Sequence, residues 1–574
     1  MTYSLSAYFI SASHNTYLVG HQLVGESTIE GYIRALLAGC RSVEVDIYDG
    51  PTEPMIFHGK TLTSKVSLRQ VCEAIHKYGF VASPYPIIIS AEMHCGLVQQ
   101  DMVAQIMMSI FGDALVRRRE FVPEAMALEL KSSSPRGSEL HRSPTVEDVE
   151  FRQATVQFLP SPEDLKGRIL LKTRNFYVSG SRSDVEGDVS TEPSASSTSD
   201  SDAFEAQLHR SMTEEFSYRR DISPGGIKDI TRSMYDRVRG KTREPPPPVG
   251  PVGTIMAPSP HTGTNAKPKM APMLRSTLVF TAGVKFRGIN KKEEYAPEHM
   301  FSLSERVINR ILKSPDETYS LIKHCRDHMV RVYPKGIRVT STNYEPHRFW
   351  AAGAQLVALN WQTFDDGYMM NNAMFQRNDG LGYVLKPRAL RCNTPSCKAL
   401  LSRKTLHNLK ITIISAQQLP RPRDSSGKDG FEKGKAAIID PFVELSVFTP
   451  DWDNRLSGSP PHSQVDVEAP RDRSGSVSSQ PRRYRTSVVK NNGFNPVWEE
   501  SFCLPFLCQG GMMDLVFLKI LIKREDKEDE EPVALHCSSL GSLARGYRHL
   551  PLYDAQLSQY LFATLFVKIE VEDI

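Results

Sequence analysis

In residues 5–115, short apolar runs alternate with amphipathic stretches in the repeating order strand, loop, helix, strand. The run Ile87–Ile89 is wholly apolar, which suits a strand buried on both faces of a sheet. Because strands separated by helices form parallel sheets, this region predicts part of an α/β fold. The predicted strands are Tyr8–Ser11, Ser42–Ile47, Met55–His58 and Pro86–Ser90, and the predicted helices are Ile29–Ala38, Leu68–Tyr78 and Leu97–Ile110.

The same alternation returns after a long polar segment. An apolar run at Arg168–Lys172 comes before that segment, and the rhythm resumes near Leu274. We therefore predict one barrel made of two halves, residues 1–176 and 274–391. Within the second half we expect strands at Thr277–Phe280, Gly336–Ser341, Gln355–Asn360 and Gly382–Leu385, and helices at Ser304–Leu312 and Tyr319–Met329.

Two polar stretches interrupt this barrel. Residues 117–155 are irregular and predict a surface insertion. Residues 177–273 include the acidic, serine-rich segment Asp184–Asp202 and the run Pro245–Pro248. Because so few apolar side chains cannot offset the entropy of ordering, we expect this linker to be disordered. Its acidic segment either competes with anionic lipid at a cationic barrel mouth or belongs to a passive tether.

After about residue 404 the pattern becomes all-β. Side chains alternate between apolar and polar in Leu409–Ser415, and further strand-like runs lie at Phe442–Phe448, Leu515–Ile522 and Ala563–Val571. Strands without intervening helices are typical of an antiparallel sandwich. We therefore predict a separate all-β domain over residues 404–574, with a loop insertion at about 450–485.

Composition limits the partners and the compartment. The chain of 574 residues is too long for one compact core, and its net charge of +4 is too mild to predict nucleic-acid binding. Basic patches would still favour an anionic membrane surface. Nine cysteines without a Cys-x-x-Cys pair suggest free thiols in a reducing compartment. Since neither a signal peptide nor an apolar run of membrane-spanning length is found, we expect a cytoplasmic protein that visits membranes peripherally.

Polar groups gather near the ends of the first predicted strands. His14 and Asn15 follow the first strand, Glu44 and Asp46 lie two residues apart on the second, and Glu92 comes after the strand at Pro86–Ser90. A parallel barrel collects its strand ends at one face, so these groups are expected to meet. Three carboxylates and an amide suit a hard cation such as Ca²⁺ or Mg²⁺ and disfavour zinc.

Two histidines and several cations complete the candidate site. His14 and His58 beside a metal site suggest acid–base chemistry. The chain contains no Gly-x-Ser-x-Gly motif, and Pro54 stands where the first glycine of a P-loop ending at Thr61 would belong. The attacking group is therefore expected to be water or a substrate hydroxyl. The cationic residues Lys172, Arg174 and Arg331 fall at the same barrel end and could hold phosphate groups.

These motifs resemble those of eukaryotic phosphoinositide-specific phospholipase C. His14-Asn15-Thr-Tyr, Glu44-Val-Asp46, Phe-His58-Gly and the segment ending in Ile-Ser-Ala-Glu92 resemble its X region. Residues 274–391 resemble its Y region, with Arg331-Val-Tyr333-Pro and Gly382-Tyr-Val-Leu-Lys-Pro387, and residues 404–574 resemble its C2 domain, with Ile439-Asp440-Pro441. The resemblance implies a distorted TIM-like (β/α)8 barrel, split by a linker and followed by an all-β C2 sandwich.

The resemblance also implies a reaction and a role for each residue. The reaction would be calcium-dependent hydrolysis of phosphatidylinositol 4,5-bisphosphate to diacylglycerol and inositol 1,4,5-trisphosphate in intracellular signalling. The inositol 2-hydroxyl would attack the 1-phosphate, and water would then open the cyclic phosphodiester. His14 would stabilise charge on the phosphoryl group, His58 would protonate the leaving oxygen, and Glu44 is the candidate base. The implied Ca²⁺ ligands are Asn15, Glu44, Asp46 and Glu92, and the implied substrate contacts are Lys172, Arg174, Ser302, Arg331 and Tyr333.

The resemblance further suggests how the protein meets a membrane. Leu23, Leu62 and Ile337 would lie on rim loops around the site, and Asp440 and Asp526 are candidate C2 calcium ligands. Two departures from the family pattern are that Arg174 replaces a common lysine and that cations interrupt the C2 loop at Lys523–Lys527. The modules that usually precede the X region are not in the sequence, which leaves open a truncated chain or docking by barrel rim and C2 domain alone.

Two other functions remain as alternatives. One is a catalytically inert lipid-binding scaffold of the same fold, although such a protein would be expected to lose a histidine or a metal ligand. The other is a glycerophosphodiesterase or bacterial-type enzyme on a similar barrel. The split barrel, the C2 domain and the paired cations disfavour this last alternative.

Overall fold

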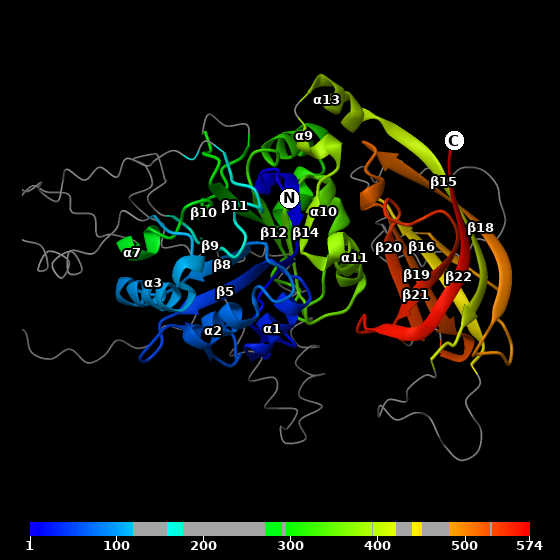
Figure 1. The fold of residues 1–574 in the computed structure, drawn as a ribbon, viewed down its shortest axis with the longest axis horizontal. Helices are drawn as coiled ribbons and strands as arrows, with labels where there is room; N and C mark the ends of the chain where they lie inside the picture. The colour runs from blue at the N-terminus through cyan, green and yellow to red at the C-terminus, as the bar shows by residue number, and fades with distance from the viewer. Residues whose placement is uncertain are drawn as a thin grey trace, which may run out of the picture.

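An α/β barrel and an all-β domain lie side by side and are connected through the helix α13 (Pro395–Ser402), as Figure 1 shows. The computed structural model describes residues 1–118, 156, 158–175, 270–289, 294–392, 394–420, 439–450, 482–527 and 531–574. The predicted linker up to residue 269, with its acidic segment, lies outside the described residues. The same holds for nearly all of the surface insertion and for most of the C2 loop insertion.

The barrel closes into a ring of parallel strands within the described residues. Each strand pairs in parallel with the next, and a bridge between Arg174 and Gly283 joins the two halves at β9 and β10. The first half supplies β2 (Ala12–Ser13), β5 (Ser42–Tyr48), β8 (Ile87–Met93) and β9 (Ile169–Lys172). The second half supplies β10 (Ala282–Gly283), β11 (His299–Ser304), β12 (Val330–Tyr333) and β13 (Leu356–Leu359). The TIM-like barrel prediction is therefore confirmed.

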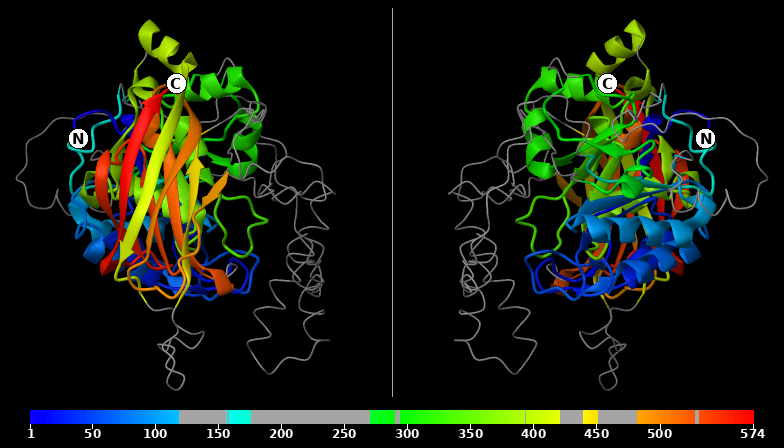
Figure 2. Two further views of the ribbon diagram at one scale, coloured as in Figure 1. Left: turned by 90° about the vertical axis from the view of Figure 1, so that its right-hand side faces the viewer. Right: turned by 90° about the vertical axis from the view of Figure 1, so that its left-hand side faces the viewer.

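Helices cover the outside of this ring, as the right view of Figure 2 shows for the first half. In α2 the cap is Ser67, whose hydroxyl accepts from the Arg69 amide, and the buried face includes Val71 and Ile75. The helices are α1 (Glu30–Leu37), α2 (Leu68–Tyr78), α3 (Leu97–Phe111), α7 (Pro272–Arg275), α8 (Glu305–Ile311), α9 (Pro315–His324), α10 (His347–Ala351), α11 (Asp366–Phe375) and α12 (Arg388–Arg391). Short antiparallel pairs join β1 (Tyr8–Ile10) to β14 (Tyr383–Leu385) and β3 (Leu18–Val19) to β4 (Glu26–Ser27).

Five predicted elements differ in the structure. The predicted strands Tyr8–Ser11 and Gly382–Leu385 correspond to β1 and β14, which pair antiparallel outside the barrel ring. The third predicted strand is a two-residue segment, β6 (Met55–Ile56), which pairs antiparallel with β5 and with β7 (Val66–Ser67), so His58 follows a hairpin and not a barrel strand. Thr277–Phe280 forms no strand, because Thr277 Oγ1 caps the end of α7 by donating to the Leu274 carbonyl at 2.6 Å. Gly336–Ser341 is a loop after β12, held by an ion pair between Arg338 and Glu305 at 2.7 Å.

The C-terminal domain is all-β, as predicted. Leu409, Ile411 and Ile413 on β15 are buried, while the residues between them are more exposed. They share one core with Val443 and Ile520 from distant strands, so the sheet folds over on itself. The strands, all antiparallel, are β15 (Lys404–Gln417), β16 (Pro441–Phe448), β17 (Arg483–Arg485), β18 (Val497–Gln509), β19 (Phe517–Arg524), β20 (Ala534–Ser539), β21 (Gly546–Tyr553) and β22 (Gln559–Asp573).

The barrel and the C2 domain share a packed interface. Trp350 on α10 lies 6.1 Å, ring to ring, from Phe517 on β19, and Lys519 donates to Asp366 at 2.8 Å. In the part of the chain that the structure describes, no helix combines the length and apolar character needed to cross a bilayer. Cysteine pairing differs from the prediction at one position, because Cys392 is disulfide-bonded. Seven cysteines are free thiols: Cys40, Cys72, Cys95, Cys325, Cys503, Cys508 and Cys537.

Candidate active site

Polar side chains from both halves converge at the carboxyl ends of the barrel strands. The register aligns Glu44 of β5 with Ser90 of β8 and Lys172 of β9, and it aligns Ser302 of β11 with Arg331 of β12. His14 follows β2 and Asn360 follows β13. The parallel topology therefore brings to one face groups that lie more than 300 residues apart in the sequence.

A buried ion pair crosses this face. A terminal guanidinium nitrogen of Arg331 lies 2.6 Å from Glu44 Oε2, and both side chains are only 2% exposed. The same carboxylate oxygen accepts a hydrogen bond from the Asn15 backbone amide at 2.8 Å. Burial lowers the pKa of Arg331, but the carboxylates of Glu44 and Glu92 raise it above its ordinary value. The guanidinium is thus charged and joins the two halves of the barrel.

Asp46 carries a carboxylate oxygen that needs a partner. Its Oδ2 accepts from the Tyr17 hydroxyl at 2.6 Å, whereas Oδ1 is buried without a hydrogen-bond partner among the described residues. Burial raises the pKa of Asp46 well above its usual range, and the neighbouring carboxylates of Glu92 and Glu44 raise it further. A cation beside Oδ1 would relieve both the desolvation and the repulsion.

Glu92 differs from Asp46 because cations already surround it. Its side chain is 53% exposed, and one carboxylate oxygen lies 3.7 Å from His94 Nε2. Desolvation by the surrounding protein raises the pKa of Glu92, but the interaction with His94 and the charges of Arg331 and Lys172 outweigh it and lower the pKa to about 2. Glu92 is therefore ionised throughout the physiological range.

The predicted metal ligands fit a hard cation in their chemistry. Asn15, Glu44, Asp46 and Glu92 supply only oxygen, three of them as carboxylates, and the orphaned oxygen of Asp46 is buried among them. Among the described residues, no three His, Cys, Asp or Glu side chains yet converge as a metal-binding cluster. The ligands do not converge because two of them already have partners: Glu44 pairs with Arg331, and one oxygen of Asp46 accepts from Tyr17. A bound cation would compete with Arg331 for Glu44.

Both predicted acid–base histidines are held through Nδ1. His14 Nδ1 lies 2.9 Å from Asn360 Oδ1, and His58 Nδ1 lies 2.6 Å from the Gln22 carbonyl. Burial lowers the pKa of each imidazole below its ordinary value. Each ring is therefore mainly neutral at neutral pH, and its Nε2 is the nitrogen left for substrate.

Cationic side chains lie on the same face as the carboxylates. Lys172 Nζ donates to Ser302 Oγ at 3.0 Å and to Ser90 Oγ at 3.4 Å, and burial together with the charge of Arg331 lowers its pKa to about 8. The Arg331 guanidinium lies 5.7 Å from the centre of the Tyr333 ring. Arg174 is exposed just beyond β9. The predicted phosphate contacts thus lie beside the predicted metal ligands.

The rim prediction needs one correction. Leu62 is 48% exposed and Ile337 is partly exposed, but Leu23 is only 8% exposed. The Leu62 amide donates to the Leu23 carbonyl at 2.9 Å, so the two loops are adjacent and Leu23 forms their buried layer. Leu23 therefore does not present its side chain to a bilayer in this structure.

The C2 candidates are engaged by cations. Asp440 Oδ1 accepts from the Asn491 amide at 2.8 Å, and its Oδ2 lies 3.4 Å from Lys490, which also pairs with Glu525. The side chain of Asp526 is 67% exposed and lies 3.4 Å from Arg524. The negative charges of Asp440 and Asp526 are thus already balanced by neighbouring basic side chains.

Two residues that the sequence did not single out hold the site together. Asn360 ends a predicted strand in the same way as the other site residues, so its position was a usable signal. Gln22 lies in the loop between β3 and β4 and is only 6% exposed. No local pattern marks it, because its contacts are with residues far along the chain.

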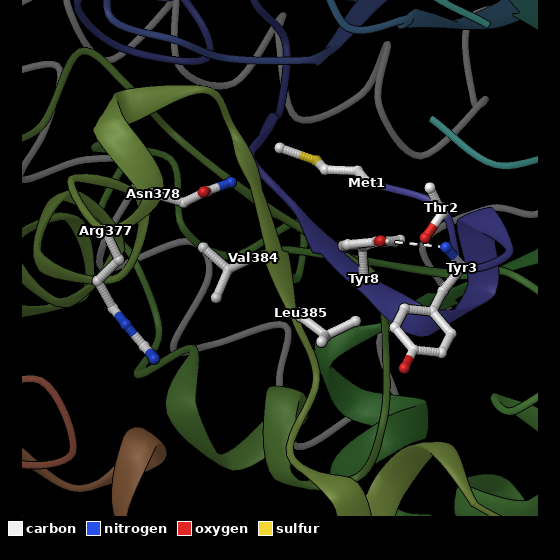
Figure 3. A pocket seen from close by; sticks show the side chains of 8 residues that line it. All are labelled: Met1, Thr2, Tyr3, Tyr8, Arg377, Asn378, Val384 and Leu385. Atoms are coloured by element: carbon white, nitrogen blue, oxygen red, sulfur yellow. Dashed lines mark hydrogen bonds between the residues drawn. The ribbon is translucent and has the colours of Figure 1, made fainter. Parts of the chain in front are cut away.

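A separate surface pocket of about 450 Å³ lies between the N-terminal segment and β14 (Figure 3). Tyr8 and Tyr3 contact each other there, the Tyr3 amide donating to the Tyr8 hydroxyl at 3.3 Å. The remaining lining residues are Met1, Thr2, Arg377, Asn378, Val384 and Leu385. With a single charged side chain and no carboxylate or histidine, this pocket lacks the groups for acid–base chemistry.

Comparison with known proteins matches these regions to three family profiles. Residues 1–134 match the phosphatidylinositol-specific phospholipase C X domain, residues 274–389 its Y domain, and residues 407–548 the C2 domain. The chain is 31% identical over 583 residues to 1-phosphatidylinositol 4,5-bisphosphate phosphodiesterase 1 of Saccharomyces cerevisiae, which covers 99% of the chain and 56% of that protein. It is 30% identical over 583 residues to the delta-4 phosphodiesterase of Bos taurus, covering 100% of the chain and 62% of the relative.

Solved structures agree at the level of the fold. The crystal structure of S. officinalis PLC21 matches with a TM-score of 0.65 and 24% identity, covering 100% of this chain and 56% of that one. The L. pealei PLC21 structure matches to the same extent. The chain thus spans a little over half the length of these proteins.

Proposed function

The chain belongs to the phosphatidylinositol-specific phospholipase C family, and from this premise we propose that it hydrolyses phosphatidylinositol 4,5-bisphosphate in a calcium-dependent reaction. The products are diacylglycerol and inositol 1,4,5-trisphosphate, formed through a cyclic phosphodiester in intracellular signalling. The observation that carries the proposal is the barrel face itself, where two Nδ1-bonded histidines meet buried carboxylates and phosphate-binding cations.

The attacking group is the inositol 2-hydroxyl, because none of the described side chains on this face is an activated nucleophile. Glu44 is the base that takes the proton of this hydroxyl. In its doubly protonated form His14 places its Nε2–H against the phosphoryl oxygens and stabilises their developing charge. His58, once protonated on both ring nitrogens, donates its Nε2 proton to the departing diacylglycerol oxygen. Its lowered pKa makes the protonated ring a stronger acid than an exposed histidine.

The cations hold the ring phosphates and set the orientation of the inositol. Lys172 and Ser302 form one donor group, since their side chains already touch at 3.0 Å. Arg331 and Arg174 contribute guanidinium groups suited to phosphate, and Tyr333 packs against the ring. The resulting charge favours the bisphosphorylated headgroup over unphosphorylated phosphatidylinositol.

Asn15, Glu44, Asp46 and Glu92 would hold the calcium ion. When bound, Ca²⁺ supplies electrostatic stabilisation of the phosphoryl charge and lowers the pKa of a coordinated hydroxyl. The protein's own contribution is to bring these oxygen ligands together and to bury one Asp46 oxygen without a partner among the described residues, beside carboxylates that favour a cation there.

Access to the lipid requires contact with a membrane. The exposed side chain of Leu62 and the partly exposed side chain of Ile337 lie on loops at the catalytic end of the barrel. We place the protein in the cytoplasm, peripherally at an anionic membrane surface. Regulatory protein partners are not specified by these residues.

The test is release of water-soluble inositol phosphates from mixed lipid vesicles, with and without calcium. We expect release by the wild-type chain only with calcium and a large loss in His14→Gln. The matched control is His76→Gln, since His76 is exposed on α2 away from the strand ends. Vesicle binding without release at any calcium concentration would instead support the inert lipid-binding scaffold.

A further inference from the structure

Gln22 forms hydrogen bonds to four residues in and around the candidate active site. Its Oε1 accepts from Asn15 Nδ2 at 2.8 Å, and its Nε2 donates to Asn360 Oδ1 at 3.2 Å and to Ser341 Oγ at 2.9 Å. Its backbone carbonyl accepts from His58 Nδ1 at 2.6 Å. No other described loop residue of the site touches the surroundings of both histidines in this way.

Backbone carbonyls fix the direction of every bond in this network. Ser341 donates its hydroxyl proton to the Gly20 carbonyl at 2.8 Å, so its Oγ must accept from Gln22 Nε2. Asn360 donates Nδ2 to the Thr342 carbonyl at 3.2 Å, so its Oδ1 faces Gln22 and His14. Carbonyl oxygens can only accept hydrogen bonds. The Ser341 hydroxyl and the Asn360 amide therefore each have only one orientation that satisfies their partners.

The ring protons follow from these directions. His58 must carry its proton on Nδ1, because its partner is the Gln22 carbonyl. His14 must do the same, because its partner is Asn360 Oδ1. The hydrogen bond on one ring nitrogen determines the state of the other. Both Nε2 atoms therefore remain as lone-pair acceptors, able to receive and pass on a proton.

We propose that Gln22 is a positioning residue which, through its backbone carbonyl and through the Asn360 amide, fixes His58 and His14 in the Nδ1–H tautomer. It also turns the Asn15 amide so that Oδ1 remains available to a ligand. The catalytic consequence rests on the proposed function, whereas the tautomer assignment does not. A wrong tautomer in an acid–base histidine can cost up to about 10⁴-fold in kcat.

Matched substitutions separate hydrogen bonding from shape. Asn360→Leu keeps the size but removes the acceptor for His14, so kcat should fall by roughly 10²-fold or more with little change in KM. Asn360→Asp keeps an acceptor and should recover most of the kcat that the leucine variant loses. Gln22→Met removes the amide that orients Asn360 and should also lower kcat. Gln362→Met is the control, because Gln362 also donates to Ser341 Oγ, at 3.1 Å, but forms no hydrogen bond to Asn360 among the described residues.

The spectroscopic readout does not need activity. In full-length protein labelled with ¹⁵N-histidine, two-bond ¹H–¹⁵N spectra distinguish Nδ1–H from Nε2–H rings, and His14→Gln and His58→Gln assign the two signals. We expect both rings as Nδ1–H in the wild type. Gln22→Met should disturb His14 while leaving His58 unchanged, since the Gln22 carbonyl is retained.

Two results would overturn the proposal. One is an Nε2–H ring for His14 or His58 in the wild-type protein. The other is equal kcat in Asn360→Leu and Asn360→Asp, which would mean that the acceptor does not matter. Failure of the proposed function has a different signature, namely no hydrolysis by the wild type while both rings still report Nδ1–H.

Discussion

The carboxylates of the barrel face and those at the loop end of the C2 domain stand in opposite environments. Burial, and then the like charges beside it, raise the pKa of Asp46, and one of its oxygens lacks a partner among the described residues. Asp440 is accessible, and the Asn491 amide and the Lys490 ammonium lower its pKa. A carboxylate that is already neutralised gains little from a bound cation. We therefore expect the barrel, and not these C2 residues, to set the calcium requirement.

Two lysines repeat the contrast. Lys172 is surrounded by protein and contacts two hydroxyl groups, and burial lowers its pKa to about 8. Lys490 is exposed and pairs with Glu525 and Asp440, and its pKa is raised. The barrel thus keeps charged groups buried despite the desolvation cost, as functional sites commonly do. The charged groups of the C2 loop instead pair with opposite charges at the surface.

The largest expected effect comes from removing the general acid of the barrel. His58→Gln should keep the fold but lower kcat on the natural lipid by about 10²–10⁴-fold, because protonation of the leaving oxygen is lost. A substrate with a much better leaving group should regain part of that activity. The control is His549→Gln, an exposed histidine of the C2 domain that stacks on Phe566. Equal losses on the two substrates would remove His58 from this role.

Charge removal from the metal ligands should be the next largest effect. Asp46→Asn and Glu92→Gln each take one negative charge from the site, so the calcium concentration for half-maximal hydrolysis should rise by roughly tenfold or more. Asp440→Asn should leave that concentration unchanged. A calcium requirement that shifts in Asp440→Asn and not in Asp46→Asn would show that the C2 domain, and not the barrel, sets it.

A smaller effect is expected from the pH dependence of phosphate binding. Lys172 binds phosphate only when protonated, and kcat/KM reports ionisation of the free enzyme, so kcat/KM should fall as pH rises through about 8. The limiting slope is about tenfold per pH unit. Lys172→Arg should shift the fall to higher pH because arginine stays charged, and Lys490→Gln should not change it. A fall that persists in Lys172→Arg would assign the ionisation to another group.

The smallest effect concerns the membrane rim. Fully burying an apolar side chain is worth roughly 1.5–3 kcal/mol, so shallow insertion of Leu62 and Ile337 should change vesicle binding by several-fold to tens-fold. Replacing both with Ser should weaken binding and hydrolysis of bilayer lipid while sparing a soluble inositol phosphodiester. Val81→Ser is the control, because Val81 is 66% exposed and precedes β8 at the opposite barrel end. A parallel loss on the soluble substrate would show that these residues support the loops and not the membrane contact.

The regular elements of the fold were predictable because their apolar periodicity is strong. The sequence boundaries of α2 agree with the structure, and β5 and β8 lie close to their predicted positions. β11 escaped prediction because Ser302 and Ser304 interrupt its apolar pattern where the strand contributes to the site. The antiparallel β6 is two residues long, and nothing local specifies its pairing.

The candidate site was predictable only in part, for a related reason. Glu44 and Glu92 lie on or next to predicted strands whose ends meet at one face of the barrel, so the sequence alone identifies them as site candidates. Gln22 acts through hydrogen bonds to residues 7 to 338 positions away, which no window of sequence contains. The burial of Leu23 likewise depends on the neighbouring Leu62 loop.

The most direct test is identification of the water-soluble product. Vesicles containing phosphatidylinositol 4,5-bisphosphate are incubated with the chain and calcium, and ³¹P NMR follows the inositol phosphates over time. The account predicts a cyclic phosphodiester together with inositol 1,4,5-trisphosphate, because the substrate hydroxyl attacks first, and no cleavage of the 2-deoxy lipid. Acyclic product from the 2-deoxy lipid, or no water-soluble phosphate from either lipid, would contradict it.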